Sequence, residues 1–127
     1  MGFSITEKII GRHIVEGEME AGKEIGINVD QIMFPDSSGT MVCLEFEALN
    51  IPKVKVKTAV GYVDHNLLQI GFENADDHLY LKTFSKKYGV IFSRAGNGIC
   101  HQLHVQRFAK PGEVLLGADS HTPTNGA

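Results

Sequence analysis

The pattern of apolar and polar positions predicts helices and strands in alternation, beginning with a helix. Ser4 and Glu7 have the spacing of a helix capping box, so we expect a first helix from about Ile5 to Ile14. Residues 24–30 then alternate between apolar and polar side chains, as a half-buried strand does. This strand is expected to lead into a polar loop around residues 35–39.

A second helix and a second strand are expected in the middle of the chain. Most residues from 40 to 49 are apolar and nothing there breaks a helix, which predicts a largely buried helix. Residues 54–58 alternate and residues 59–63 are apolar, so we expect a strand region that delivers Asp64 and His65 at its carboxyl end. Because α/β sheets bind ligands at the carboxyl ends of their strands, this placement favours a functional role.

The strongest helical pattern lies between residues 74 and 88. Leu81, Phe84 and Tyr88 recur at helical spacing, and Gly89 follows where a C-terminal cap is expected. Alternating helices and strands are typical of a layered α/β domain. The remaining pattern predicts a strand at 90–92, a turn at 94–98, a helix at 99–108 and a buried strand at 113–118.

Composition narrows the class of protein without naming a partner. A chain of 127 residues is long enough for one compact domain, so a single domain over 1–127 is expected. Lys plus Arg is 12 and Asp plus Glu is 15, so there is no basic excess to indicate nucleic-acid binding. No apolar run could cross a bilayer, and the first residues do not have the pattern of a signal peptide. A cytoplasmic location is the default expectation.

Cys43 and Cys100 are the two cysteines of the chain, and they lie far apart in sequence. Neither belongs to a C-x-x-C pair, so the segment offers neither a metal knuckle nor a disulfide framework. Free cysteine is among the most buried residue types, and we therefore expect both side chains to be small buried apolar groups.

Three polar clusters follow an apolar strand or a Gly-rich turn, at residues 64–65, 97–101 and 119–121. An imidazole beside a carboxylate can be held in one tautomer with a raised pKa, which makes it a usable general acid near neutral pH. Two such pairs suggest proton transfer to and from a substrate. Asp119-Ser120-His121 does not indicate a serine hydrolase, because adjacent side chains cannot form a nucleophile–base–orienter line.

Each histidine also has an ordinary structural interpretation, as a hydrogen-bonded core or turn residue. His101 and His104 have the i, i+3 spacing of a helical metal pair, but no third ligand is evident. His13 and His78 lie among charged residues and are expected to be solvated. The Gly-rich turn at 96–98, before a helix, could hold a phosphate or carboxylate through backbone N–H groups.

The segment Leu116–Gly126 closely resembles the DSHTP signature of the aconitase superfamily. Tyr62–His65 and Phe92–His101 precede it in the order found in the N-terminal region of that family, and Glu73–His78 is a further shared stretch. The resemblance covers nearly the whole chain and is strongest to the compact bacterial and archaeal aconitase or homoaconitase type. It implies a three-layer α/β/α fold and an incomplete domain, the N-terminal segment of a longer chain.

The resemblance also implies a reaction, the reversible dehydration of a hydroxy tri- or dicarboxylate such as citrate, through cis-aconitate, on a 4Fe-4S cluster. The three cluster cysteines of the family lie later in the chain than residue 127. Cys43 and Cys100 do not match their positions and are not expected to be ligands. Residues 1–127 alone are therefore expected to be inactive.

Site residues follow from the resemblance position by position. Asp64 and His65 would protonate the departing hydroxyl, and His101 with Asp119 would form a second pair beside the substrate. Substrate contacts are expected from Ser120 and Asp36, and His121 is expected in the same shell.

The sequence departs from the family pattern at Pro35, where the family usually has Gln or His. The expected partners are a small-molecule polycarboxylate and either the remainder of the chain or a small subunit. A non-catalytic paralogue that binds polycarboxylates or a protein is the alternative. RNA binding, known for some aconitases, is a third interpretation that the near-neutral charge does not favour.

Overall fold

A computed structural model of the protein describes residues 2–126. The first part of the chain forms α1 (Ile5–His13), β1 (Ile14–Glu16), β2 (Gly26–Ile27), β3 (Gln31–Pro35) and α2 (Asp36–Ala48). The second part forms β4 (Thr58–Tyr62), α3 (Glu73–Tyr88), β5 (Ile91–Ser93), α4 (Cys100–Arg107), β6 (Leu115–Gly117) and the 3-10 helix η1 (Thr122–Gly126). Within residues 2–126, no helix is long and apolar enough to span a bilayer.

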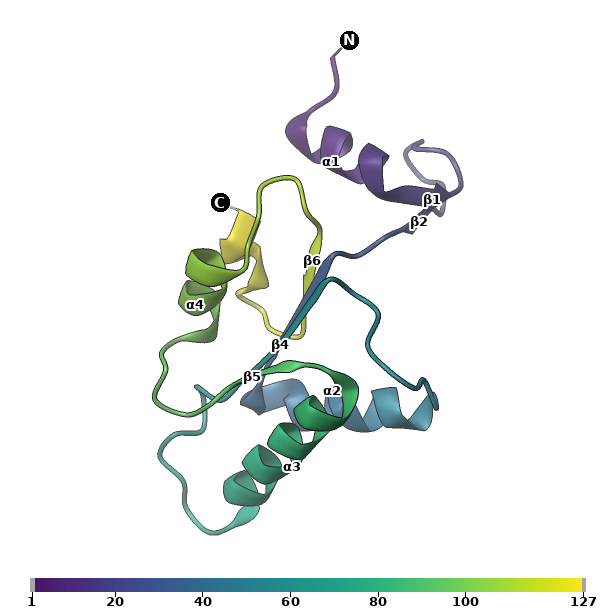
Figure 1. Ribbon diagram of the computed structural model, residues 1–127. Helices are drawn as coiled ribbons and strands as arrows, with labels where there is room; N and C mark the ends of the chain where they lie inside the picture. Colours follow the sequence, from purple (N-terminus) through teal and green to yellow (C-terminus); the bar gives the residue numbers. More distant parts are fainter. Residues whose placement is uncertain (1, 127) are drawn as a thin grey trace.

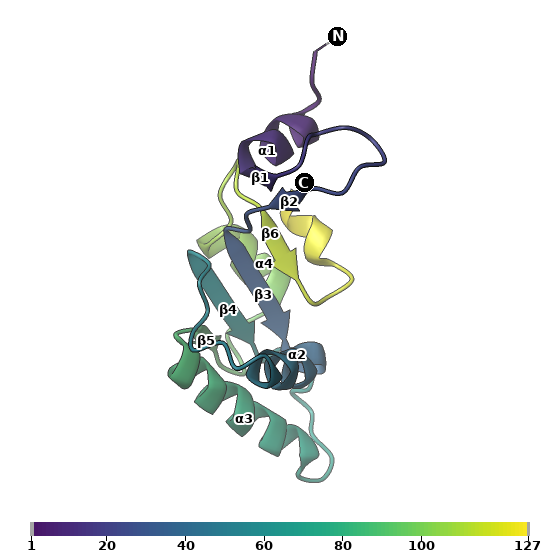
Figure 2. The ribbon, with the colours of Figure 1, turned by 90° about the vertical axis from the view of Figure 1, so that its right-hand side faces the viewer.

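Four parallel strands form the central sheet, in the order β5-β4-β3-β6. Helices α2 and α3 cover one face and α4 covers the other (Figures 1 and 2). The expected three-layer α/β/α fold is therefore confirmed. A separate antiparallel hairpin, β1-β2, lies with α1 at the amino ends of the central strands (Figure 2).

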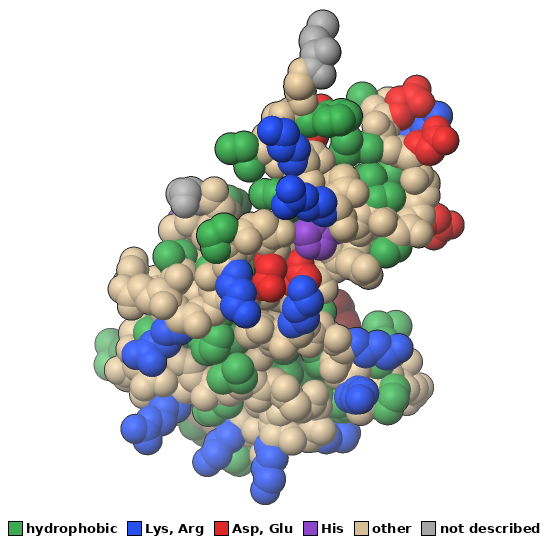
Figure 3. Space-filling model, turned by 45° about the horizontal axis from the view of Figure 1, so that its top comes forward, with side chains coloured by type: hydrophobic (Ala, Val, Ile, Leu, Met, Phe, Trp, Pro, Cys, Tyr) green, Lys and Arg blue, Asp and Glu red, His purple; other side chains and the backbone are tan. Residues whose placement is uncertain are grey.

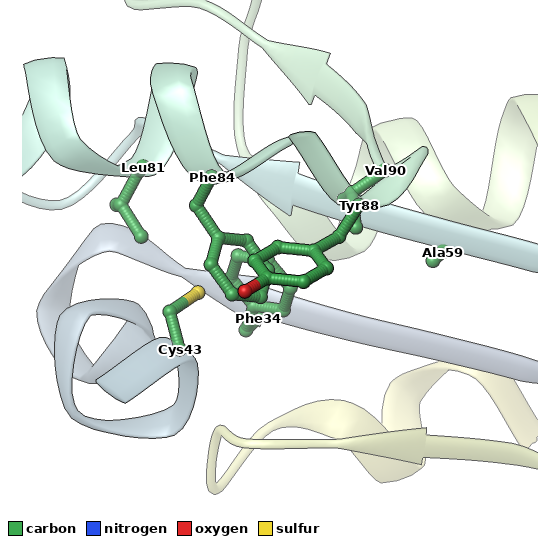
Figure 4. Close-up of a cluster of buried hydrophobic side chains, with 7 residues drawn as sticks. All are labelled: Phe34, Cys43, Ala59, Leu81, Phe84, Tyr88 and Val90. Atoms are coloured by element: carbon green, nitrogen blue, oxygen red, sulfur yellow. The ribbon is translucent and has the colours of Figure 1, made fainter. Parts of the chain in front are cut away.

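The layer on the α2 and α3 side is an aromatic core (Figure 4). Phe84 lies with its ring centroid 4.5 Å from that of Tyr88 and 6.4 Å from that of Phe34. A Cβ atom at Gly61 would lie 2.7 Å from the Phe34 ring, and one at Gly39 would lie 2.9 Å from it. The Phe34 ring thus fills the space left by two glycines, one in β4 and one in α2.

The layer on the α4 side is smaller and includes buried polar groups. Met33, Val60 and Tyr62 point to this face from β3 and β4, and Cys100 and Leu103 meet them from α4. Successive residues of β3 and β4 alternate between the two layers, as the pleat of a strand requires. Both strands are therefore buried on both faces, which is typical of parallel sheets.

Several sequence predictions are confirmed by the elements as they stand. Ser4 caps α1, and its backbone N–H donates to the Glu7 carboxylate while the Glu7 N–H donates to the Ser4 hydroxyl. Helix α3 ends at Gly89, which has a left-handed φ of 78°. The strand after it, the turn at 94–98 and α4 also lie where the sequence predicts them.

The predictions of a strand at 24–30 and of a loop at 35–39 are wrong. Within 24–30 only Gly26–Ile27 form a strand, in the surface hairpin, and the long strand of the sheet is β3, which begins at Gln31. No loop separates β3 from α2, because Pro35 ends the strand and Asp36 begins the helix. Proline has no backbone N–H to donate, and this costs nothing at the start of a helix, where the N–H groups have no partner within the helix. An acidic residue in the first turn complements the helix dipole.

Two predictions of burial are also wrong. In α2 only Asp36, Gly39 and Cys43 are buried, whereas Met41 is 68% exposed. In β6, Leu116 is 62% exposed because β6 is an edge strand of the sheet. An apolar run therefore indicates the element correctly but does not indicate how much of it is covered.

Asp30 links the hairpin unit, which consists of α1 and the β1-β2 hairpin, to the central sheet. Its carboxylate accepts hydrogen bonds from the His13 ring at 2.7 Å and from the Val114 backbone N–H at 2.9 Å, and it pairs with Lys57 at 2.7 Å. The hydrogen bond from Lys57 is the main cause of a pKa of about 2 for this carboxyl. The expectation that His13 is solvated is wrong, since its side chain is 13% exposed. Figure 3 shows the hairpin unit as a lobe above the body of the sheet, with both acidic and basic side chains on the lobe and mostly basic ones on the lower part of the molecule.

Candidate active site

Four elements place polar residues at the carboxyl edge of the sheet. Asp36 follows β3, Asp64 and His65 follow β4, and Asp119 follows β6. His101 lies in the first turn of α4 and points to the same edge. The structure therefore brings together side chains that are up to 83 residues apart in the sequence, Asp36 and Asp119 being the most distant.

The Asp36 carboxylate lies beneath the site and is completely buried. It accepts hydrogen bonds from three consecutive backbone N–H groups, those of Asp64 at 3.2 Å, His65 at 2.9 Å and Asn66 at 3.0 Å. The ring of His78 donates a fourth, at 2.9 Å. Burial opposes the charge of this carboxylate, but the four donors outweigh burial and lower its pKa. The side chain is thus fully used in holding the loop after β4, and it offers no free oxygen to a substrate.

His78 was expected to be solvated, and this is wrong. Its side chain is 14% exposed, and its Nε2 donates to Asp36. The other ring nitrogen, Nδ1, is 3.2 Å from the amide nitrogen of Gln69. His78 therefore supports the same loop from α3.

Asp64 and His65 form the first imidazole–carboxylate pair. The His65 ring donates from Nδ1 to the Asp64 carboxylate at 3.0 Å. The second Asp64 oxygen accepts the backbone N–H of Cys100 at 2.7 Å, at the amino end of α4. Burial opposes the charged form of His65, but the hydrogen bond from its ring to Asp64 and the charges of Asp64, Asp119 and Asp36 raise its pKa. The ring is 38% exposed and so remains accessible.

Asp119 and His101 form the second pair, which lies against the first. His101 donates from Nε2 to Asp119 at 2.8 Å, and the backbone N–H of His121 donates to the same oxygen at 2.8 Å. The other Asp119 oxygen lies 3.5 Å from Nε2 of His65. The His121 backbone donor is the main cause of a lowered pKa for Asp119. Asp119 thus lies between the two imidazoles.

Ser120 and His121 lie at the open side of the site. The His121 ring is 77% exposed, and its Nδ1 is 3.2 Å from the Ser120 hydroxyl oxygen. The rings of His121 and His101 have centroids 6.0 Å apart. An open depression runs across this region, and its lining residues are Asp64, His65, Ile99, His101, His121 and Thr124. Asn97 is not among them, since its amide donates to Ser93 near the edge strand β5.

Comparison with known proteins identifies the family to which this chain belongs. The sequence profile of the Aconitase family (aconitate hydratase) matches residues 7–127. The chain belongs to the aconitase family.

Individual relatives cover almost the whole chain. The large subunit 1 of 3-isopropylmalate dehydratase from Thermotoga maritima is 35% identical over 126 residues, which are 99% of this chain and 30% of that protein. Large subunit 2 from Archaeoglobus fulgidus is 32% identical over 99% of this chain and 30% of its own length. A probable mitochondrial aconitate hydratase from Dictyostelium discoideum is 29% identical over 97% of this chain and 18% of its own length. The chain thus spans about 30% of the length of the dehydratase subunits it matches.

The cysteines of this aconitase-family segment do not fit an iron-sulfur cluster. Cys43 is buried in the layer under α2 and α3, whereas Cys100 is buried on the opposite face of the sheet. Two cysteines buried on opposite faces of a sheet cannot ligate one cluster together. Both cysteines are thus buried apolar groups, as the sequence predicts.

A single metal ion is also a poor description of the polar cluster. Ligand atoms of His101, Asp119 and His121 lie within 4.8 Å of one another. The Asp119 oxygen nearest both rings is already hydrogen-bonded to the His101 ring and to the His121 backbone. The cluster therefore has the hydrogen bonding of a set of acid–base groups.

Sequence reasoning missed the residues that support this aconitase-family site. Asn66 and His78 bind Asp36, and Ile99 and Thr124 line the depression. His78, Ile99 and Thr124 lie in the three stretches Glu73–His78, Phe92–His101 and Leu116–Gly126 that carry the family resemblance, and this is the signal that could have identified them. Nothing in the local pattern indicates the role of Asn66.

Proposed function

We propose that the complete protein is a hydro-lyase that reversibly removes water from a hydroxy di- or tricarboxylate. The observation that carries this proposal is the ring of His65, accessible in an open depression and surrounded by three carboxylates, Asp36, Asp64 and Asp119. Membership of the aconitase family and the dehydratase and hydratase names of its relatives support the reaction class. Residues 1–127 supply one incomplete domain to that enzyme.

His65 has the geometry of a general acid. Its raised pKa shifts the ring toward the imidazolium, and Nδ1 is held by Asp64. The remaining proton is on Nε2, which lies 3.5 Å from Asp119, too far for a strong hydrogen bond. This proton is therefore available to a substrate hydroxyl, which would otherwise have to leave as hydroxide, a poor leaving group. As the C–O bond breaks and water leaves, a base would take the proton of the neighbouring carbon, and the electron pair of that C–H bond would form the double bond. We propose that this base lies outside residues 1–127.

The second pair would bind and orient the substrate. His101 donates to Asp119 and lines the depression together with His121. Ser120 does not line it, but it is exposed beside His121, with its hydroxyl oxygen 3.2 Å from Nδ1 of that ring. We propose that Ser120 contacts a substrate carboxylate and that His101, Asp119 and His121 complete the proton-transfer shell. For Asp36 we replace the expected substrate contact with a positioning role, because all its bonding is internal to the chain.

The remaining parts of the active site would come from chain segments or a subunit outside residues 1–127. Since Cys43 and Cys100 do not fit a 4Fe-4S cluster, we propose that any cluster ligands lie outside residues 1–127. Relatives named as large subunits also suggest that a small subunit, or the remainder of a longer chain, completes the site. The role of His65 does not depend on where those parts lie.

The test is turnover by the complete protein with citrate, isocitrate, cis-aconitate and 3-isopropylmalate. We expect one of these to be converted, and His65→Gln to lower kcat by about 100-fold or more, because general acid catalysis typically contributes that much. His13→Gln is the matched control, since it removes another imidazole paired with a carboxylate, at the opposite end of the sheet. It should leave kcat within about twofold of the wild-type value.

The competing function is binding without turnover, as in a non-catalytic paralogue. Tight binding of these acids by calorimetry, without conversion of any of them by the reconstituted protein, would support that function and reject the hydro-lyase. Equal losses of kcat in the His65 and His13 variants would reject the acid role of His65.

A further inference from the structure

A chain of buried polar side chains lies under the site on the α4 side of the sheet. His104 is fully buried, one helical turn after His101 on α4. Its two ring nitrogens lie 2.9 Å from the Tyr62 hydroxyl and 2.8 Å from the Gln31 side-chain oxygen. His104 therefore joins α4 to β4 and to β3 at the same time.

The partners of this chain fix the form of the His104 ring. The Gln31 amide nitrogen donates to the Phe108 carbonyl and to the Glu113 carboxylate, so its oxygen faces His104. That oxygen can only accept, and Nε2 of His104 must carry the proton. Nδ1 is then unprotonated and accepts the hydrogen bond of the Tyr62 hydroxyl. The ring is held neutral in one tautomer, which also leaves it no lone pair for a metal ion shared with His101.

Burial is the main reason why a second proton on the His104 ring is disfavoured, and it lowers the pKa of that ring. The nearby His101 lowers the pKa further. Burial raises the pKa of Tyr62, so Tyr62 stays a neutral hydroxyl and supplies no negative charge to stabilise an imidazolium. Glu113 is in contact with Gln31 and with Lys57, so its charge is partly compensated.

The His101 ring depends on the placement of its helix. Its Nε2 donates to Asp119, but its Nδ1 is buried and makes no hydrogen bond within the described residues. Asp119 alone therefore does not fix the ring, and the backbone of α4 must set its position. Hydrogen bonds hold that backbone at two points: the N–H of Cys100 donates to Asp64, and the His104 ring is hydrogen-bonded to Tyr62 and Gln31.

We propose that His104, held neutral between Tyr62 and Gln31, is a positioning residue that sets His101 against Asp119. At both points the hydrogen bonds reach strand β4 or the loop after it, so α4 is held directly against the strand that delivers Asp64 and His65. The two imidazole–carboxylate pairs are thereby kept at a fixed position relative to each other. This inference rests on the hydro-lyase function for its kinetic consequence but not for its structural one.

The kinetic test compares His104→Leu with His104→Gln in the complete protein. Leu removes both hydrogen bonds, and we expect kcat to fall by about tenfold or more with KM within about threefold, because misplacement of a catalytic group lowers the rate of the chemical step. The Gln side chain offers one donor and one acceptor, and it should recover kcat to within about threefold of the wild-type value. Equal kcat for Leu and wild type would overturn the proposal.

Leu103→Ala is the control for a merely structural effect. Leu103 packs in the same layer from the neighbouring position of α4, and its truncation removes apolar contacts only. It should lower the free energy of unfolding while leaving the kcat of the folded enzyme within about twofold. If Leu103→Ala and His104→Leu lower kcat equally, the positioning role is rejected in favour of packing.

A spectroscopic readout separates failure of this proposal from failure of the proposed function. With ¹⁵N-labelled histidine, the wild-type protein should show His104 as the neutral Nε2–H tautomer from about pH 5 to about pH 8, whether or not it turns over any acid. The His101 ring signal should shift in His104→Leu and return toward its wild-type position in His104→Gln. An unchanged His101 signal in the Leu variant, or a titrating His104, would overturn the proposal even if the enzyme is active.

Discussion

At the scale of the residue, the charge of His65 is the property on which the proposed chemistry depends. Asp64→Asn removes the negative charge nearest to His65 and replaces one of the two accepting oxygens, which face the His65 ring and the Cys100 N–H, by an NH2 group. Burial continues to disfavour the imidazolium. We therefore expect the pKa of His65 to fall in this variant, and the upper limb of the pH–activity profile to move to lower pH. A histidine titration followed by NMR measures the pKa directly.

Asp76→Asn is the matched control for this titration. Asp76 is an exposed carboxylate in the first turn of α3. Its removal should leave the pKa of His65 where it is. A His65 pKa that is the same in Asp64→Asn and in the wild-type protein would show that the Asp64 contact has no electrostatic effect.

Asp36 gives the largest expected effect on stability. Asp36→Asn puts an amide nitrogen among four donors, so it should lower the free energy of unfolding by about 2 to 4 kcal/mol. Because the pKa of Asp36 is lowered in the folded state, the stabilisation is present above the pKa of the unfolded chain. It is lost as the pH falls through the folded-state pKa. Urea unfolding at several pH values measures both effects, with Asp76→Asn as the comparison.

The residues with chemistry were more predictable than the residues that hold them. The residues with chemistry stand in recognisable local motifs: Asp64, His65 and Asp119 come directly after apolar strands, and His101 follows a Gly-rich turn. His78 and His13 instead find their partners 42 and 17 residues away. No local pattern encodes such pairings, and both side chains were therefore assigned to solvent.

At the scale of the element, the contact of β4 with the Phe34 ring leaves no room for a side chain at Gly61. Gly61→Ala would place a Cβ atom 2.7 Å from that ring, and we expect it to lower the free energy of unfolding by about 1 to 3 kcal/mol. Gly11→Ala in α1 is the counterpart, since its Cβ would meet only Met19, at 3.6 Å. That change should stabilise α1 locally, by up to about 1 kcal/mol. Hydrogen exchange in each element gives the sign of both effects.

Local signals predicted the elements with clear ends. The capping box at Ser4 and the left-handed Gly89 fix two helix ends by backbone geometry alone, and both were predicted. The start of α2 was not, because Pro35 and Asp36 have the composition of a loop. Only the pairing of Pro35 with Tyr62 in the sheet shows that the strand continues to the start of the helix.

At the scale of the whole molecule, an apolar loop next to the site remains uncovered. Leu68, Ile70 and Phe72 are 92%, 89% and 69% exposed. Such a surface favours association, so we expect isolated residues 1–127 to self-associate at high concentration. Leu68→Ser with Ile70→Ser should reduce this in sedimentation experiments. The paired change Val15→Ser and Ile27→Ser, in the hairpin, is the control and should have a smaller effect.

Each helical layer of the fold contains one cysteine, so the reactivity of the two thiols reports how often each layer separates from the sheet. Cys43 can be alkylated only when the α2–α3 layer separates from the sheet, and Cys100 only when α4 does. Pulse labelling of the complete protein, with each peptide followed by mass spectrometry, would give two separate opening rates. We expect Cys100 to label faster, since its layer is smaller and α4 has eight residues against 13 in α2. Equal rates at all denaturant concentrations would show instead that the two faces of the sheet open together.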